Sequence, residues 1–203
     1  MKLKGHTLPG YTVYEYFLIL SLPLPLQQEI LELRKRFVAE YNPWYTIKGK
    51  PSLALAHFLQ YEEFEERILL VLKKLADASP PLLLTLKNFA SFPSHTIYIN
   101  PVSNDPLQAL IKGIQSGGKQ VMRINEKTKP MFMSEPHISI ARKLSSEEYE
   151  ISWPKYRDAH FDSEFHADEM ILLKRPQGVK SWTLARRFEF LNLSVSPRQG
   201  ELF

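Results

Sequence analysis

The sequence predicts an α+β domain with two lobes, each a sheet with helices on its outer face. Strand and helix patterns alternate twice along the 203 residues, roughly as β-α-β-α-β-β and then as a looser α-β-(α)-β-β. No stretch of linker composition separates the halves. We therefore expect residues 1–193 to form a single bilobal domain with a concave surface between the lobes, followed by a flexible tail at 194–203.

The first half contains four apolar runs of strand length and two helix patterns. Residues 14–21 are rich in β-formers, and prolines stop them, so residues 17–26 indicate a buried strand that runs into a proline turn. Apolar residues recur at helical spacing in 27–41 and 62–76. The other expected strands are 52–59, 82–92 and 95–102.

The second half opens with a short helix at 107–114, which follows Asp105-Pro106 and ends at Gly117-Gly118. A strand is expected at 136–144 and a helical turn at 153–160. Two further strands, 170–174 and 182–190, are joined by a turn at 176–178.

Composition excludes several classes of function. The chain has no cysteine, which rules out disulfide scaffolds, thiolate zinc sites and cysteine nucleophiles and is compatible with the reducing cytoplasm, where we expect the protein. No segment approaches the roughly 18 apolar residues of a membrane span, so we expect no membrane association. Lys and Arg number 26 against 22 Asp and Glu, a net charge of +4 that mildly favours an anionic partner.

Two motif-like segments have structural explanations. Residues 113–120 read GIQSGGKQ and resemble a Walker A loop, but Gln120 stands where Ser or Thr binds magnesium, and a helix precedes the segment instead of a strand. The polar run from His160 to Asp168 contains two histidines and two aspartates, but their spacing matches no zinc pattern. We expect a helix end at the first segment, a surface loop at the second, and no metal.

Residues 136–140 read PHISI and carry candidate chemistry. On a strand His137 and Ser139 share one face, while Ile138 and Ile140 point to the other. An imidazole can transfer a proton, and a neighbouring hydroxyl can donate a hydrogen bond to a phosphoryl oxygen. From these residues alone, a buried strand with a polar outer face is the favoured explanation.

A second segment has the same layout 85 residues earlier. Residues 50–56 read KPSLALA, so Ser52 and Ala54 occupy the positions that His137 and Ser139 occupy in the later segment. The paired arrangement resembles the 2H phosphoesterase superfamily, the fold of 2′-5′ RNA ligases and cyclic nucleotide phosphodiesterases. Its signature is His-x-Thr/Ser-x, with x usually apolar, once in each lobe. The resemblance spans about residues 10–192.

The resemblance implies a LigT-like pseudo-symmetric fold in which two antiparallel sheets face a central cleft and the helices lie outside. It also implies that two histidines act as general base and general acid on a 2′,3′-cyclic or 2′-5′ phosphodiester, without a metal or other cofactor. The Thr or Ser hydroxyls hold the phosphate. A nucleotide or the phosphate at an RNA end is the implied ligand.

Carried over residue by residue, the resemblance makes His137 and Ser139 the catalytic pair of the second motif, at 137–140. The first motif, near 52–55, departs at both functional positions, because Ser52 replaces the histidine and Ala54 the hydroxyl residue. These two positions, with the neighbouring Lys50, are the candidate substrate-binding residues.

The direction in which two further basic residues face depends on whether their strands are regular. His57 shares parity with Leu53 and Leu55, so on a regular strand it faces away from Ser52, and only a bulge would turn it back. Arg142 is separated from His137 by an odd number of positions and is expected to face outward on the same reasoning.

Three functions follow as hypotheses. The intact second motif favours a weak or altered phosphoesterase that acts on a nucleotide or RNA end. The double replacement in the first motif favours a non-catalytic protein that binds a nucleotide, RNA or another anion. A protein-interaction module without a ligand is the third. Trp44, Tyr45 and Trp153, in or near expected loops, allow either base stacking or partner contacts and do not decide between these hypotheses.

Overall fold

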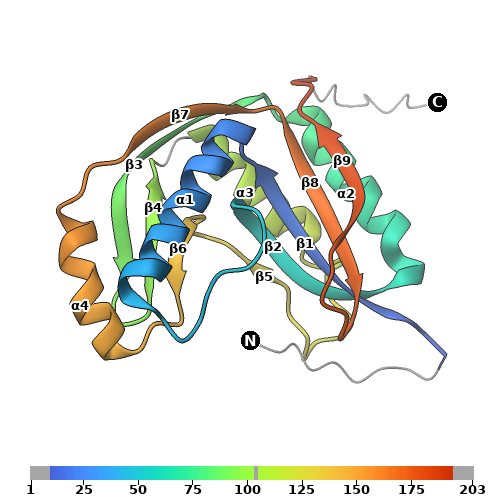
Figure 1. Cartoon of the computed structure of the whole chain (residues 1–203). Coiled ribbons are helices and arrows are strands. Elements are labelled where there is room, and N and C mark those ends of the chain that lie inside the picture. The colour runs from blue at the N-terminus through green and yellow to red at the C-terminus, as the bar shows by residue number, and fades with distance from the viewer. Residues whose placement is uncertain (1–9, 103–104, 194–203) are drawn as a thin grey trace, which may run out of the picture.

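The computed structural model describes residues 10–102 and 105–193, and their strands form two antiparallel sheets. The first sheet has five strands in the order β5-β2-β1-β8-β9, and the second has four in the order β6-β4-β3-β7. Figure 1 shows the second sheet at the left and the first at the right. The predicted α+β fold with two antiparallel sheets is confirmed, while the expected tail at 194–203 lies outside the described residues.

The sheets do not follow the two halves of the chain. The first contains β1 (Val13–Ser21), β2 (Ser52–Tyr61), β5 (Met131–Phe132), β8 (Glu169–Pro176) and β9 (Thr183–Glu189). The second contains β3 (Leu82–Phe92), β4 (Thr96–Pro101), β6 (Ile138–Arg142) and β7 (Asp162–Ala167). Each sheet therefore takes strands from both halves. The chain crosses from one to the other between β7 and β8, because β7 pairs with β3 whereas β8 pairs with β1.

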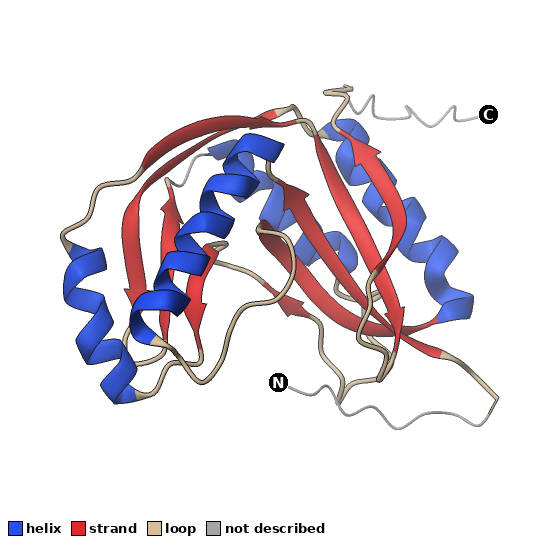
Figure 2. Ribbon diagram, viewed as in Figure 1, coloured by secondary structure: helices blue, strands red, loops and turns tan. Residues whose placement is uncertain are grey.

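Among the described residues, four α-helices and one 3-10 helix accompany the sheets (Figure 2). They are α1 (Leu24–Tyr41), η1 (Glu62–Phe64), α2 (Glu65–Ala78), α3 (Asp105–Gly118) and α4 (Ser146–Arg157). Helices α2 and α3 pack together and contact β9 and β5, α4 contacts β3 and β4, and α1 contacts β6. Apolar residues from both sheets and all four α-helices join in one main core cluster.

Three helices, α1, α3 and α4, are longer than expected, and α3 extends the expected helix at both ends. The proline turn predicted at the end of 17–26 is instead the first turn of α1, which begins at Leu24 with Pro25 near its start. Proline is compatible with a first helical turn, whose N–H groups have no partner in the helix. The helical turn expected at 153–160 is the end of the three-turn helix α4, whose start is fixed by a capping box between Ser145 and Glu148.

The polar run from His160 to Asp168 is mostly a strand instead of a surface loop. In β7, Phe165 and Ala167 are buried while His166 is exposed, so strand alternation is present but short. The three apolar residues Phe161, Phe165 and Ala167 are the signal that the polar residues obscured. In the described part of the chain, no three acidic or histidine side chains gather as a metal site would require.

The Walker-like segment lies in and just after α3, as the sequence predicted in placing a helix there. Its glycines serve helix packing, because a Cβ at Gly113 would lie 3.1 Å from the side chain of Leu75 on α2. A Cβ at Gly118 would meet Met122 at 2.6 Å. These close approaches give the glycine-rich pattern a packing explanation.

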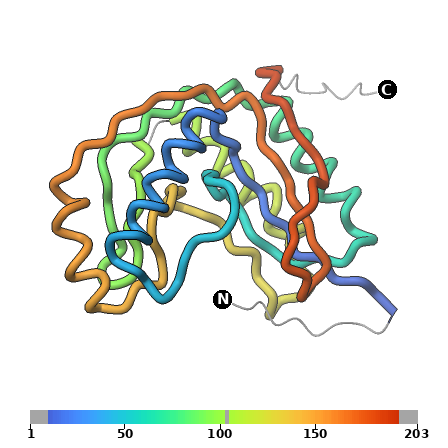
Figure 3. The backbone as a smooth tube through the Cα atoms, viewed as in Figure 1, coloured from blue at the N-terminus to red at the C-terminus, as the bar shows by residue number. Residues whose placement is uncertain are grey.

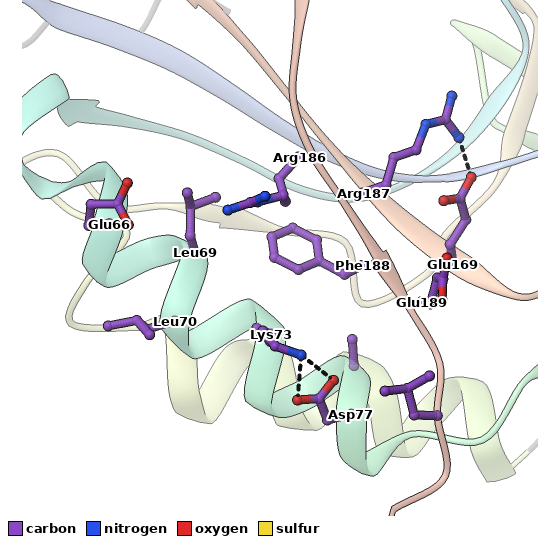
Figure 4. A pocket seen from close by; sticks show the side chains of 12 residues that line it. Glu66, Leu69, Leu70, Lys73, Asp77, Glu169, Arg186, Arg187, Phe188 and Glu189 are labelled. Carbon is purple, nitrogen blue, oxygen red and sulfur yellow. Dashed lines mark hydrogen bonds and ion pairs between the residues drawn. The ribbon is translucent and has the colours of Figure 1, made fainter.

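No helix among the described residues is long and apolar enough to cross a membrane. A cavity of about 420 Å³ lies between α2 and β9, where Lys73 pairs with Asp77 and Arg187 pairs with Glu169 (Figure 4). None of the candidate site residues lines it.

Candidate functional site

His137 and Ser139 lie on one face of the second sheet, as strand parity predicts. Ile138 and Ile140 are buried in the core, whereas His137 and Ser139 are half-buried on the opposite side, which we call the motif face. Ser139 pairs with Tyr98 of β4. The imidazole of His137 lies against an aromatic wall, with its ring centre 4.9 Å from both Phe92 and Tyr98. This packing holds the histidine at the start of β6.

A backbone contact and burial together set the protonation of His137. Its Nδ1 lies 3.0 Å from the carbonyl oxygen of Glu135, which accepts a hydrogen bond when Nδ1 carries the proton. Burial lowers the pKa of His137, and the positive charge of Arg142 lowers it further, against an opposing effect of the Glu135 contact. A neutral imidazole with its proton on Nδ1 leaves a lone pair on Nε2 at neutral pH.

Ser52 and Ala54 take the equivalent positions on β2 of the first sheet. Leu53 and Leu55 are buried, while Ser52 and Ala54 are half-buried. Ser52 therefore points away from the core, as it must if the two motifs are equivalent. Lys50 is exposed immediately before the strand.

A register shift in β2 changes where His57 points. Leu18 pairs with Ala56 and Ile19 with Ala54, so Leu55 is an extra residue in the ladder. His57 then pairs with Phe17, which shares a side of β1 with Ile19, the partner of Ala54. The expectation that His57 faces away from Ser52 is wrong, because the strand is not regular.

β6 carries the same irregularity at the corresponding place. Ile97 pairs with Ala141 and Tyr98 with Ser139, so Ile140 is the extra residue. Arg142 pairs with Thr96 and is exposed, and the register returns it to the side of Ser139. The expectation of an outward-facing Arg142 is therefore wrong for the same physical reason. In each of the two motif strands, β2 and β6, the residue pattern is shifted by a bulge. As a result a basic residue, His57 or Arg142, lies on the same side of its sheet as the two motif positions.

His57 sits in a closed cluster. Its Nε2 is buried, has no hydrogen-bond partner in the described residues, and lies 3.8 Å from Glu15 Oε2. Arg175 donates to the same carboxylate from Nε at 2.8 Å and stacks over Trp182 at 4.2 Å. Burial lowers the pKa of His57, with Glu15 opposing. The ring is thus held neutral among aromatic and charged side chains.

Arg34 on α1 ties the two motifs together. Its guanidinium donates two hydrogen bonds to the carbonyl of Ser139, at 3.0 and 2.9 Å, and one to the carbonyl of Gly49, at 3.2 Å. The residue is only 9% exposed, and burial together with Arg142 lowers its pKa to about 10, so it is charged at neutral pH. Cα atoms of β2 and β6 approach within 8 Å, and Arg34 joins β6 to the loop that leads into β2.

A family model matches most of the chain. The model of the 2′-5′ RNA ligase superfamily matches residues 22–178, which include both motifs. The chain belongs to the 2′-5′ RNA ligase superfamily. A relative named "Putative phosphoesterase GK0864", from Geobacillus kaustophilus (strain HTA426), is 29% identical over 187 residues, which cover 86% of this chain and 95% of that protein.

Solved structures show the same fold at lower sequence identity. TT0787 of Thermus thermophilus superposes with a TM-score of 0.63 at 18% identity, covering 87% of this chain and 98% of that one. E. coli LigT, crystallised with 3′-AMP, gives a TM-score of 0.63 at 15% identity and covers 88% and 98% of the two chains.

That His137 and Ser139 form a complete second motif, while Ser52 and Ala54 stand in a first motif without its functional groups, stays a prediction from the sequence. Sequence reasoning missed Arg34 as a contact of the site, although a signal was present. Ile30, Arg34 and Phe37 recur at helical spacing on the buried side of α1, so the arginine interrupts an apolar face. A charge on such a face needs fixed partners, and here they are the two backbone carbonyls.

Proposed function

We propose that this member of the superfamily binds a nucleotide or RNA-end phosphate on the motif face and hydrolyses its phosphodiester weakly, without a metal. The observation that carries the proposal is the placement of His137 and Ser139 side by side on that face, with Nδ1 of His137 against the carbonyl of Glu135. The histidine can then act as a base, and the hydroxyl can hold the phosphoryl group.

The chemistry follows from these groups. Nε2 of neutral His137 takes a proton from water as the water oxygen attacks phosphorus. The bond between phosphorus and a ribose oxygen then breaks. The hydroxyl of Ser139 donates to a non-bridging oxygen, and the guanidinium of Arg142, on the same face, offsets the growing negative charge. The leaving alkoxide takes its proton from solvent, because Ser52 is too weak an acid to supply one.

The missing acid sets the expected rate. A general acid or base contributes about 10²–10⁴-fold, so a site with one histidine is slowed by that factor. Ala54 also supplies no hydroxyl for the phosphate. Binding is less affected than hydrolysis, since His137, Ser139 and Arg142 all stay on the face. Structures of LigT with 3′-AMP and with phosphate support a ligand of this chemistry for the shared fold.

The replacement of both first-motif groups also favours a second function, binding without turnover. In that case the protein takes the same phosphate-bearing ligand and releases it unchanged. The two functions share a site and differ only in whether the phosphodiester is cleaved.

The test is hydrolysis of 2′,3′-cyclic nucleotides by the purified protein and by His137→Ala. We expect slow turnover that falls to the uncatalysed rate in the variant, together with weaker binding of the nucleotide. If both proteins hydrolyse at the uncatalysed rate but only the native protein binds the nucleotide, the protein is a binding protein and not an enzyme. Binding that His137→Ala does not weaken would contradict both.

A further inference from the structure

A second cavity, of about 410 Å³, lies between α1, β6 and the loop that joins α1 to β2. Figure 3 shows this loop turning back beside the end of α1, next to β6. The wall that β6 contributes consists of Ile140 and Ala141, which are buried on the side of the strand opposite to the motif face. The volume lies within the roughly 300–1,000 Å³ of pockets that hold small molecules. The cavity is therefore separate from the surface that carries His137.

One face of α1 turns apolar side chains toward this cavity. Four lining residues recur at helical spacing, and they are Leu31, Arg34, Lys35 and Val38. Leu31 and Val38 are half-buried, and so is Ile47, which lines the cavity from the loop. None of these three apolar residues belongs to a core cluster of the described residues. Their side chains are therefore available to pack against an apolar ligand.

Arg34 brings a buried positive charge to the same cavity. Its side chain is among those that line the cavity, although the residue is only 9% exposed. In the part of the chain that the structure describes, no ion pair joins Arg34 to a carboxylate, whereas its neighbour Lys35 pairs with Glu32 at 2.6 Å. Burial of a cation is unfavourable unless an anion pairs with it. The charge of Arg34 therefore favours an anionic ligand.

The guanidinium of Arg34 also has hydrogen-bond donors to spare. Arginine has five N–H groups, and three of them are used here. Nε and Nη2 donate to the carbonyl of Ser139, and Nη1 donates to the carbonyl of Gly49. One N–H on each Nη nitrogen is thus left without an acceptor among the described residues. The two oxygens of a carboxylate match such a pair of donors.

We propose that this cavity binds a small amphipathic carboxylate, whose charged group pairs with Arg34 and whose apolar body packs against Leu31, Val38 and Ile47. A neutral apolar molecule would leave the buried charge unpaired, and inorganic phosphate would leave the apolar walls without a contact. The site goes beyond the proposed function, because it lies on the other side of β6 and requires no phosphodiester. Its ligand would contact the same guanidinium that holds the carbonyl of Ser139.

The experiment compares the binding of octanoate with that of octanol, which has the same apolar chain without the charge. We expect octanoate to bind at least about tenfold more tightly, since hydrogen bonds to a charged group contribute at least about this much. Titration with octanoate should shift the amide NMR signals of residues 31–47 and 139–142.

Val38→Glu tests the pairing with Arg34. This substitution places a carboxylate one helical turn from Arg34, where it competes with the ligand, so the preference for octanoate should be lost. Val38→Gln has nearly the same shape without the charge and should keep the preference. Gln28→Glu is the matched control for the added charge, because Gln28 is exposed on α1 and does not line the cavity.

Four outcomes would overturn the proposal. Equal affinities of the native protein for octanoate and octanol would show an apolar cavity without an anion site, and no binding of octanoate at millimolar concentration would show no site. Displacement of octanoate by inorganic phosphate, with unchanged affinity in Val38→Glu, would assign the carboxylate to the motif face. Dissociation of a dimer by octanoate would assign the cavity to a second copy of the chain. These measurements involve no hydrolysis, so the proposed function is tested separately.

Discussion

The strands that carry the two motifs have the same layout but different chemistry. Residues 51–57 read PSLALAH and residues 136–142 read PHISIAR, with leucines or isoleucines in the core and an alanine before a basic residue. Each strand holds one extra residue directly after its second motif position. The backbone geometry of a motif strand therefore follows its apolar residues and not the residues at its two candidate functional positions.

The surroundings of the two basic residues differ. His57 is enclosed by Glu15, Arg175 and Trp182, whereas Arg142 is exposed and pairs with no carboxylate in the described residues. The first sheet has thus closed its basic position with protein groups. The second leaves its basic position exposed, on the same sheet as the candidate catalytic residues His137 and Ser139.

The largest expected effect comes from giving β2 the chemistry of β6. Ser52→His with Ala54→Ser supplies a general acid and a hydroxyl on a face that the register already provides. We expect hydrolysis of a 2′,3′-cyclic nucleotide to rise about 10²–10⁴-fold, the usual contribution of such a group. The rate should gain nothing from these substitutions in a His137→Ala background. An unchanged rate in a folded double variant would show that the two faces do not act on one phosphate.

The junction between the motifs gives the next largest effect. Arg34→Met removes three hydrogen bonds and leaves the carbonyls of Ser139 and Gly49 without their buried guanidinium donor. We expect a loss of about 2–4 kcal/mol in the free energy of unfolding, measured by urea denaturation. Lys35→Met, an exposed neighbour on α1, is the control and should change little. A loss below about 1 kcal/mol would mean that Arg34 does not hold the strands.

How much of this site the sequence predicts depends on local regularity. Alternation along 136–140 correctly separates His137 and Ser139 from the isoleucines, and the repeated layout locates Ser52 and Ala54. The alternation pattern does not predict the bulges, because the extra residue in each strand is apolar and no polar residue marks its position. Adjacent buried pairs, Leu55-Ala56 and Ile140-Ala141, are the trace of each bulge, but a strand buried on both faces produces the same pattern.

Long-range pairing is the other limit. The alternating elements predict two sheets but not that β8 joins β1, since both sheets have strands of similar composition. The hydrogen bonds from Arg34 to Ser139 join residues 105 positions apart in the sequence. The one sequence signal for them is a charged residue on the apolar face of α1.

The enclosed His57 of the first sheet predicts that the free energy of unfolding depends on pH. Burial holds the pKa of His57 below its usual value, so as pH falls below about 6.5 the unfolded chain takes up a proton before the folded chain does. Stability should be highest above pH 6.5 and fall on acidification, by at most about 1.4 kcal/mol per pH unit from this group. Urea midpoints at pH 7.5 and pH 5 measure the change.

His57→Gln should reduce that loss without abolishing it, because burial lowers the pKa of His137 in the same direction. The comparison uses the difference between the two pH values in each protein, so a uniform cost of the substitution cancels. Identical pH dependence in both proteins would show that His57 titrates alike in the folded and unfolded chain.

The helices that follow the motif strands provide the smallest test. α2 follows β2 with no side-chain cap, whereas α4 follows β6 with the capping box of Ser145 and Glu148, and Glu148 also accepts the backbone N–H of Trp44. Ser145→Ala should lower the free energy of unfolding by about 1 kcal/mol. Its neighbour Ser146→Ala is the matched control and should cost much less, because Ser146 makes no cap. Equal losses in the two variants would show that the capping box adds nothing to the stability of the protein.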